Sequence, residues 1–222
     1  NSMITAVNSY LKWAGQAEFS IHTCRVQKQI FREKSRELGK EEYYRLLNAA
    51  VSEKRERLSG ILRTIAATGM RIGELRYLTV ETLSRQKIEI HFKGKQRVIL
   101  MARSLVIFLR DYCRRNRITS GIIFATKNGN PVDRRNIWAE MKELCEPARV
   151  LPSKVFPHNL RHLFARCFYE RERDLVRLAD YLGHSSIETT RRYTMITSEE
   201  ACARELELGL AGNESWGGAE KK

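Results

Sequence analysis

The sequence predicts an α+β fold that is mostly helical and contains one small antiparallel hairpin. Apolar residues recur at helical spacing over most of the 222 residues. The alternation of apolar and polar residues that is typical of strands is clear only on the two sides of a basic turn, Lys93-Gly94-Lys95-Gln96. The sequence shows no internal repeat and no Rossmann-like pattern, so we expect one core with a smaller appendage.

The N-terminal part begins with a helix predicted over 4–14, which Gly15 ends. A polar, basic and poorly periodic stretch over 16–39 follows, and we interpret it as a linker that lies along a negatively charged partner. The main domain is predicted over 40–210, and a Gly-rich, frayed tail over 211–222.

The main domain is predicted to start with two helices, at 40–52 and 54–67, the second ended by Gly69 in the left-handed conformation. A short helix then turns Ile72, Leu75 and Leu78 inward. The elements predicted after it are the two hairpin strands at 87–92 and 97–101, a helix at 104–115, a strand at 121–124, a helix at 134–144 capped by Asp133, and helices at 158–169, 173–182, 186–192 and 199–208.

The charge of the chain is strongly positive, with 40 Lys and Arg against 26 Asp and Glu and a net charge of +14. An excess of this size favours a polyanionic partner, because cations that neutralise phosphates release counterions. Nucleic acid is therefore favoured over an anionic membrane surface.

The cysteines and the N-terminus indicate a protein of the cytoplasm. Five scattered cysteines form no C-x-x-C pair, so we expect buried thiols in a reducing compartment rather than disulfides or a zinc finger. No apolar run reaches the ~20 residues that span a bilayer. The first residues lack the plan of a secretion signal and an initiator Met, which indicates a cut chain.

Two arginines, two histidines and one tyrosine stand out at long intervals, and they suit the cleavage of a phosphodiester without a metal. The planar fork of arginine binds phosphate oxygens in pairs and keeps its charge. Tyrosine is a nucleophile once cations lower its pKa of ~10. Lysine or histidine supplies a proton to the leaving oxygen. The residues are Arg71, His158, Arg161, His184 and Tyr193.

Each of these residues also has a purely structural interpretation. Arg71 can be a surface residue paired with Glu74 three positions later, Lys93 a solvated hairpin charge, and Tyr193 a half-buried aromatic. His158 and His162 have a spacing that zinc sites use, but no Glu lies between them and no Cys pair is near, so we expect no metal.

The combination resembles the tyrosine recombinase (phage-type integrase) catalytic domain. The resemblance rests on five motifs in one order: Thr68-Gly69-Met70-Arg71-Ile72-Gly73-Glu74-Leu75, Lys93 in a hairpin, His158-x-x-Arg161, Leu182-Gly183-His184, and Tyr193. It runs from about Lys40 to about Leu210. Ile4–Gly15 resembles the last helix of the family's core-binding domain, most of which is missing from this chain.

The resemblance implies an enzyme that breaks and rejoins DNA strands without cofactor or metal. Tyr193 would attack a DNA phosphate and form a 3′-phosphotyrosyl link, leaving a free 5′-hydroxyl, while Arg71 and Arg161 clamp the scissile phosphate. A 5′-hydroxyl of another strand would reverse the step, so bond energy is conserved.

The resemblance also assigns supporting roles. His158 would assist proton transfer at Tyr193, His184 would hydrogen-bond the phosphate, and Glu74 would orient the site. Lys93 would protonate the leaving 5′-oxygen; Lys95, on the other side of Gly94, is the alternative.

The implied partners are double-stranded DNA and other protomers in a tetrameric synapse, with no membrane. The helix predicted at 199–208 would dock onto a neighbouring protomer or pack within its own chain. Phe156–His162 resembles the corresponding segment of bacterial mobile-element integrases. Two alternatives are a type IB topoisomerase, which relaxes supercoils by similar chemistry, and a DNA-binding module without catalysis.

Overall fold

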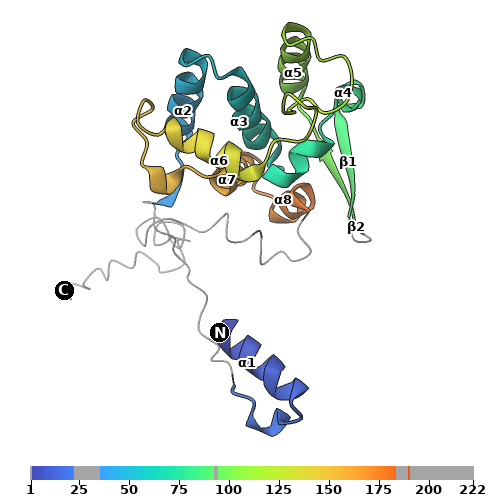
Figure 1. Cartoon of the computed structure of the whole chain (residues 1–222), viewed down its shortest axis with the longest axis vertical. Coiled ribbons are helices and arrows are strands. Elements are labelled where there is room, and N and C mark those ends of the chain that lie inside the picture. Colours follow the sequence, from blue (N-terminus) through green and yellow to red (C-terminus); the bar gives the residue numbers. More distant parts are fainter. Residues whose placement is uncertain (1, 23–35, 93–94, 184–189, 191–222) are drawn as a thin grey trace, which may run out of the picture.

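The computed structural model describes residues 2–22, 36–92, 95–183 and 190. In these residues a helical body carries one two-stranded sheet at its side (Figure 1). The α-helices are α1 (Ser2–Trp13), α2 (Lys40–Ser52), α3 (Glu56–Thr68), α4 (Val80–Arg85), α5 (Arg103–Arg115), α6 (Arg134–Glu143), α7 (Pro157–Glu172) and α8 (Leu175–Leu182). Short 3-10 helices are η1 (Ala17–Phe19), η3 (Ile72–Tyr77) and η4 (Pro152–Lys154), and the strands are β1 (Lys87–Phe92) and β2 (Lys95–Leu100).

Helix α3 is the centre of the body and contacts α2, α5, α6 and α7. Its apolar residues recur every three or four positions and face all of these neighbours, so Leu58, Ile61, Leu62 and Ile65 are buried. Truncating one of them to Ala would cost about 2–5 kcal/mol of unfolding free energy. Helix α3 ends at Thr68, so this buried centre lies close in the chain to Arg71.

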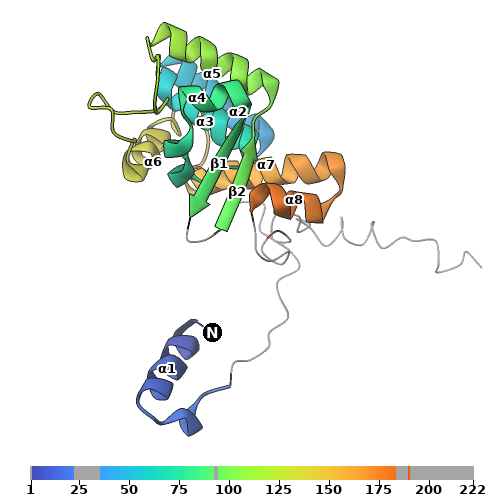
Figure 2. The same cartoon turned by 90° about the vertical axis from the view of Figure 1, so that its right-hand side faces the viewer.

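The hairpin is antiparallel, and its register pairs Lys87 with Leu100 and Phe92 with Lys95. Strand β2 therefore starts two residues earlier than the predicted 97, because Lys95 continues the ladder that was assigned to the turn. Figure 2 shows α8 beside β2, and β1 contacts η3. The sheet thus lies between the segment that follows Arg71 and the helix that ends at Leu182.

The predicted strand at 121–124 is wrong. Ile122 forms only an isolated bridge with Thr79, and Ile123 donates its N–H to the carbonyl of Leu78. Ile123 and Phe124 are buried by core contacts rather than by a sheet, which is why an apolar run looked like a strand. The other helices predicted between 40 and 182 are present within a few residues of their expected bounds, although the short one after Arg71 is a 3-10 helix.

The end of the predicted linker packs into the body. Leu38 is buried, Glu37 pairs with Arg166 of α7 at 2.6 Å, and the Arg36 carbonyl accepts a hydrogen bond from Asn159 at 2.8 Å. The packed unit therefore includes residues 36–39, which the prediction assigned to the linker.

Helix α1 forms as predicted and turns into η1 through Gly15, which has φ +74. No helix among the described residues is long and apolar enough to cross a membrane. The helices predicted at 186–192 and 199–208, and the tail, lie outside the described residues except for residue 190.

Candidate active site

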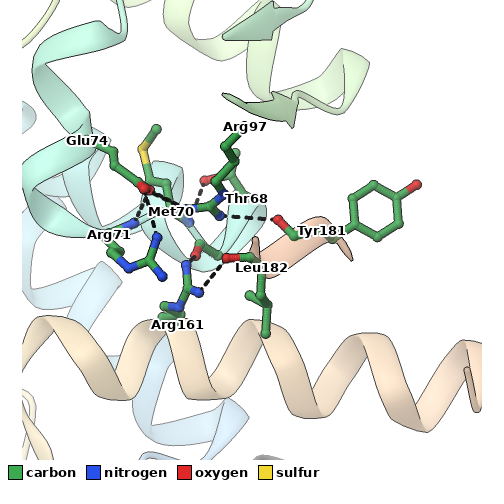
Figure 3. A network of polar contacts seen from close by, with 9 residues as sticks. Thr68, Met70, Arg71, Glu74, Arg97, Arg161, Tyr181 and Leu182 are labelled. Carbon is green, nitrogen blue, oxygen red and sulfur yellow. Dashed lines mark hydrogen bonds and ion pairs between the residues drawn. The ribbon is translucent and has the colours of Figure 1, made fainter. Parts of the chain in front are cut away.

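A cleft of about 1110 Å³ opens where η3, β2, α7 and α8 meet. It gathers residues that are far apart in the sequence, and four of the predicted site residues line it: Arg71, Glu74, His158 and Arg161. The lining also includes Arg97 and Gly183. Figure 3 shows the three guanidinium groups and Glu74 close together between these elements.

Arg161 is held by two helix ends. It lies on α7 and is only 2% exposed. Its Nη1 donates to the carbonyl of Gly69 at 2.5 Å, just after α3, and its Nη2 donates to the carbonyl of Leu182 at 2.7 Å, the last residue of α8 (Figure 3). Helix C-termini carry partial negative charge, so both partners stabilise a cation. Because carbonyls are neutral, these two contacts fix the guanidinium without cancelling its charge.

Gly69 and Gly183 make this arrangement possible. Each ends its helix in the left-handed conformation, with φ of +63 and +62. A Cβ at Gly69 would lie 2.4 Å from Phe164, and one at Gly183 would lie 2.6 Å from the Arg97 side chain. The two motifs Thr68-Gly69 and Leu182-Gly183 therefore play the same structural role. Each places a carbonyl at a helix end, where it accepts a hydrogen bond from Arg161.

Arg71 is held differently, by a carboxylate. It precedes η3, and its side chain is 50% exposed. Glu74 accepts from the Arg71 backbone N–H at 2.7 Å and from its Nη1 at 3.0 Å. Arg71 therefore forms the ion pair with Glu74 that the structural interpretation of the sequence predicts. The same residue also lines the cleft.

Arg97 completes the cluster, and sequence reasoning missed it. Its Nη1 lies 2.6 Å and 2.7 Å from the two oxygens of Glu74, and its Nη2 donates to the carbonyl of Tyr181 at 3.2 Å (Figure 3). Burial lowers the pKa of Arg97, against the attraction of Glu74. Strand alternation could have found it: Arg97 and Ile99 point inward, while Val98 and Leu100 are exposed.

His158 lies at the N-terminal start of α7, directly after Pro157, and is exposed at the cleft. Its ring meets the ring of buried His162 edge-on, with centroids 4.4 Å apart. The spacing of three residues puts His158 and Arg161 at the same cleft, as the sequence predicts. Within the described ranges, no group of three His, Cys, Asp or Glu lies close enough to hold a metal ion.

Three predicted site residues, Lys93, His184 and Tyr193, lie outside the described residues. Two of them adjoin described parts of the site in the chain: Lys93 follows β1, and His184 follows Gly183. Lys95 is the first residue of β2.

Comparison with known proteins gives one consistent result. Residues 36–200 match the model of the phage integrase family. The chain is 29% identical over 209 residues to the tyrosine recombinase XerA of Pyrococcus furiosus, covering 90% of this chain and 70% of XerA. It is 30% identical over 148 residues to the tyrosine recombinase XerD of Vibrio cholerae, covering 63% of this chain and 49% of XerD.

Solved structures agree. A crystal structure of XerA recombinase matches with a TM-score of 0.65 at 27% identity, covering 95% of this chain and 74% of that one. The Tn1549 transposon integrase in complex with circular intermediate DNA matches with a TM-score of 0.70, covering 92% of this chain and 77% of that one. At 17% identity the latter likeness concerns the fold. The matched part of the chain spans about half the length of XerD and 70% of XerA.

Proposed function

The chain belongs to the phage integrase family of tyrosine recombinases, and we propose that it cleaves and rejoins DNA at a specific site through a 3′-phosphotyrosyl intermediate. One observation carries the proposal. Arg71, His158 and Arg161, which are up to 90 residues apart in sequence, line a single open cleft. Two guanidiniums and an imidazole at one cleft suit a phosphate that gains charge in its transition state.

The proposed step is an in-line displacement at phosphorus. The phenol oxygen of Tyr193 loses its proton with help from His158 and forms the new P–O bond. The bond from phosphorus to the 5′-oxygen breaks, and Lys93 gives that oxygen a proton. Arg71 and Arg161, with His184, bind the non-bridging oxygens. Attack by a 5′-hydroxyl of another strand releases Tyr193 and restores the starting protonation.

The partners we propose are double-stranded DNA and three further protomers. The net charge of +14 supports the DNA partner. Among the similar folds is a lambda integrase tetramer bound to a Holliday junction, which supports a tetrameric synapse. We further propose that the chain serves the integration and excision of a mobile element, and that residues 1–15 end a core-binding domain that precedes the catalytic one.

The test does not require that the DNA sequence cleaved by the chain be known in advance. The chain is incubated with a pool of duplexes that carry a randomised central segment, and DNA bound covalently to protein is recovered under denaturing conditions and sequenced through several rounds. We expect one sequence to be enriched. A nicked version of that duplex should then trap an adduct that resists EDTA, and Tyr193→Phe should trap none.

Other outcomes identify the alternatives. Relaxation of a supercoiled plasmid that lacks the enriched sequence favours a topoisomerase. Enrichment by non-covalent binding alone, with no adduct from any duplex, favours a DNA-binding module and contradicts the proposed chemistry.

A further inference from the structure

Arg97 is a largely buried charge at the cleft that the proposed chemistry does not use. Its side chain is 10% exposed, and its Nε is buried without a hydrogen-bond partner among the described residues. Burial of a cation is unfavourable unless the surroundings compensate for it. The lowered pKa of Arg97 reflects this burial. A residue kept at this cost in stability is expected to serve the site that it adjoins.

The first consequence of Arg97 concerns charge. Glu74 carries one negative charge and contacts both Arg71 and Arg97, with Arg97 the closer partner at 2.6 Å against 3.0 Å. Without Arg97, the pair of Arg71 and Glu74 would have no net charge. With Arg97 the trio carries one positive charge, so Arg71 can be held by a carboxylate and still attract a phosphate.

The second consequence concerns geometry. The same guanidinium that binds Glu74 donates from Nη2 to the carbonyl of Tyr181, near the end of α8. The next carbonyl along the chain, that of Leu182, accepts from Arg161. Arg97 therefore ties the segment that presents Arg71 to the helix end that holds Arg161, from a strand 23 residues after Glu74 and 84 residues before Tyr181. In Figure 3 it lies between the two groups.

We propose that Arg97 is a positioning residue for strand cleavage: it neutralises Glu74, so that Arg71 keeps its charge for the scissile phosphate, and it fixes η3 relative to α8. This inference rests on the proposed function. The proposed role requires a positively charged side chain that donates hydrogen bonds in two directions, to Glu74 and to the carbonyl of Tyr181. Lysine offers the charge as a single point, so it can satisfy Glu74 but not both partners.

The test measures single-turnover cleavage of the nicked duplex enriched by covalent capture, for wild type, Arg97→Lys, Arg97→Met, Glu74→Gln and the double variant Glu74→Gln/Arg97→Met. We expect Arg97→Met to slow cleavage about 100-fold and Arg97→Lys about 10-fold. Glu74→Gln removes the carboxylate that offsets the charge of Arg71 when Arg97 is absent. The double variant should therefore cleave at least about tenfold faster than Arg97→Met. Duplex binding should change less than about threefold in all of them.

Cleavage rates are compared at a temperature at which the variants are folded, so that a rescue reports the restored field around Arg71 and not a restored fold. If Arg97→Met does not fold, the double variant and Arg97→Lys decide the question. Arg97→Lys cleavage at the wild-type rate, or a double variant no faster than Arg97→Met where the latter folds, overturns the proposal. A wild-type chain that forms no adduct overturns the proposed function instead, so the two failures are distinct.

Discussion

Arg71 and Arg161, two of the arginines that line the cleft, are held by opposite means. Arg161 is almost fully buried and is bound by neutral carbonyls at two helix ends. Arg71 is half exposed and is bound by the carboxylate of Glu74. The carbonyl arrangement preserves the charge but needs a helix terminus on each side. The carboxylate arrangement can be built locally, within one turn of η3, but it requires a second cation, Arg97, to restore the charge.

Loss of Arg161 and loss of Arg71 should therefore change the free energy of unfolding by different amounts. The carbonyls around Arg161 are buried, and each one left without a donor costs about 1–3 kcal/mol of unfolding free energy. Removing Arg71 leaves Glu74 still paired with Arg97. Arg161 should therefore matter for both folding and cleavage, and Arg71 for cleavage alone.

The largest effect is expected for Arg161→Ala. Cleavage of the captured duplex should fall about 10³-fold or more, because a cation fixed at the transition state is lost. Duplex binding should stay within about tenfold, since many other phosphate contacts remain. Rapid-quench cleavage and fluorescence anisotropy would measure the two quantities, and a parallel collapse of binding in a folded protein would contradict the assignment.

Arg71→Ala should come next. Cleavage should fall about 10²–10³-fold, while the free energy of unfolding should change by less than about 0.5 kcal/mol, as for most exposed positions. Urea unfolding would give the stability. The matched control for stability is Arg76→Ala, which removes another exposed arginine, in the 3-10 helix that follows Arg71. A stability loss as large as that of Arg161→Ala would show that the two arginines are not held in the contrasting ways described.

Gly183→Ala should disturb the supports of both arginines, because Gly183 follows Leu182, which binds Arg161, and lies against Arg97. The left-handed backbone costs about 1–3 kcal/mol with a side chain, and the new Cβ would meet Arg97 Cδ at 2.6 Å. We expect the melting temperature to fall and cleavage to slow at temperatures where the protein is folded.

Gly73→Ala is the control with the smallest expected effect, because nothing lies within 4 Å of its Cβ and its φ is not positive. Its unfolding free energy should stay within about 0.5 kcal/mol of wild type. Equal losses in the two glycine variants, measured by thermal unfolding, would argue against the tight approach of Arg97 to Gly183.

Local patterns predicted most of the elements. Helical spacing predicted α2, α3, α5 and α7, and Gly15 and Gly69 marked helix ends because glycine adopts the left-handed conformation without strain. The strand at 121–124 failed for the opposite reason. A short apolar run indicates that a segment is buried, but it forms a strand only where a second strand pairs with it.

The sequence by itself indicated the family and predicted which residues form the site, because those motifs are short and each requires particular residue types. It also contained the i, i+3 pair of Arg71 and Glu74 and the shared face of His158 and Arg161, since both follow from the pitch of a helix.

Only the tertiary structure decided what holds the arginines. Arg161 takes its partners from residues 92 positions before it and 21 after it, and Arg97 takes its own from 23 before and 84 after. No local pattern encodes such a contact, because it depends on where α3, β2 and α8 end relative to one another. The charge available in the cleft is therefore a property of the packed fold.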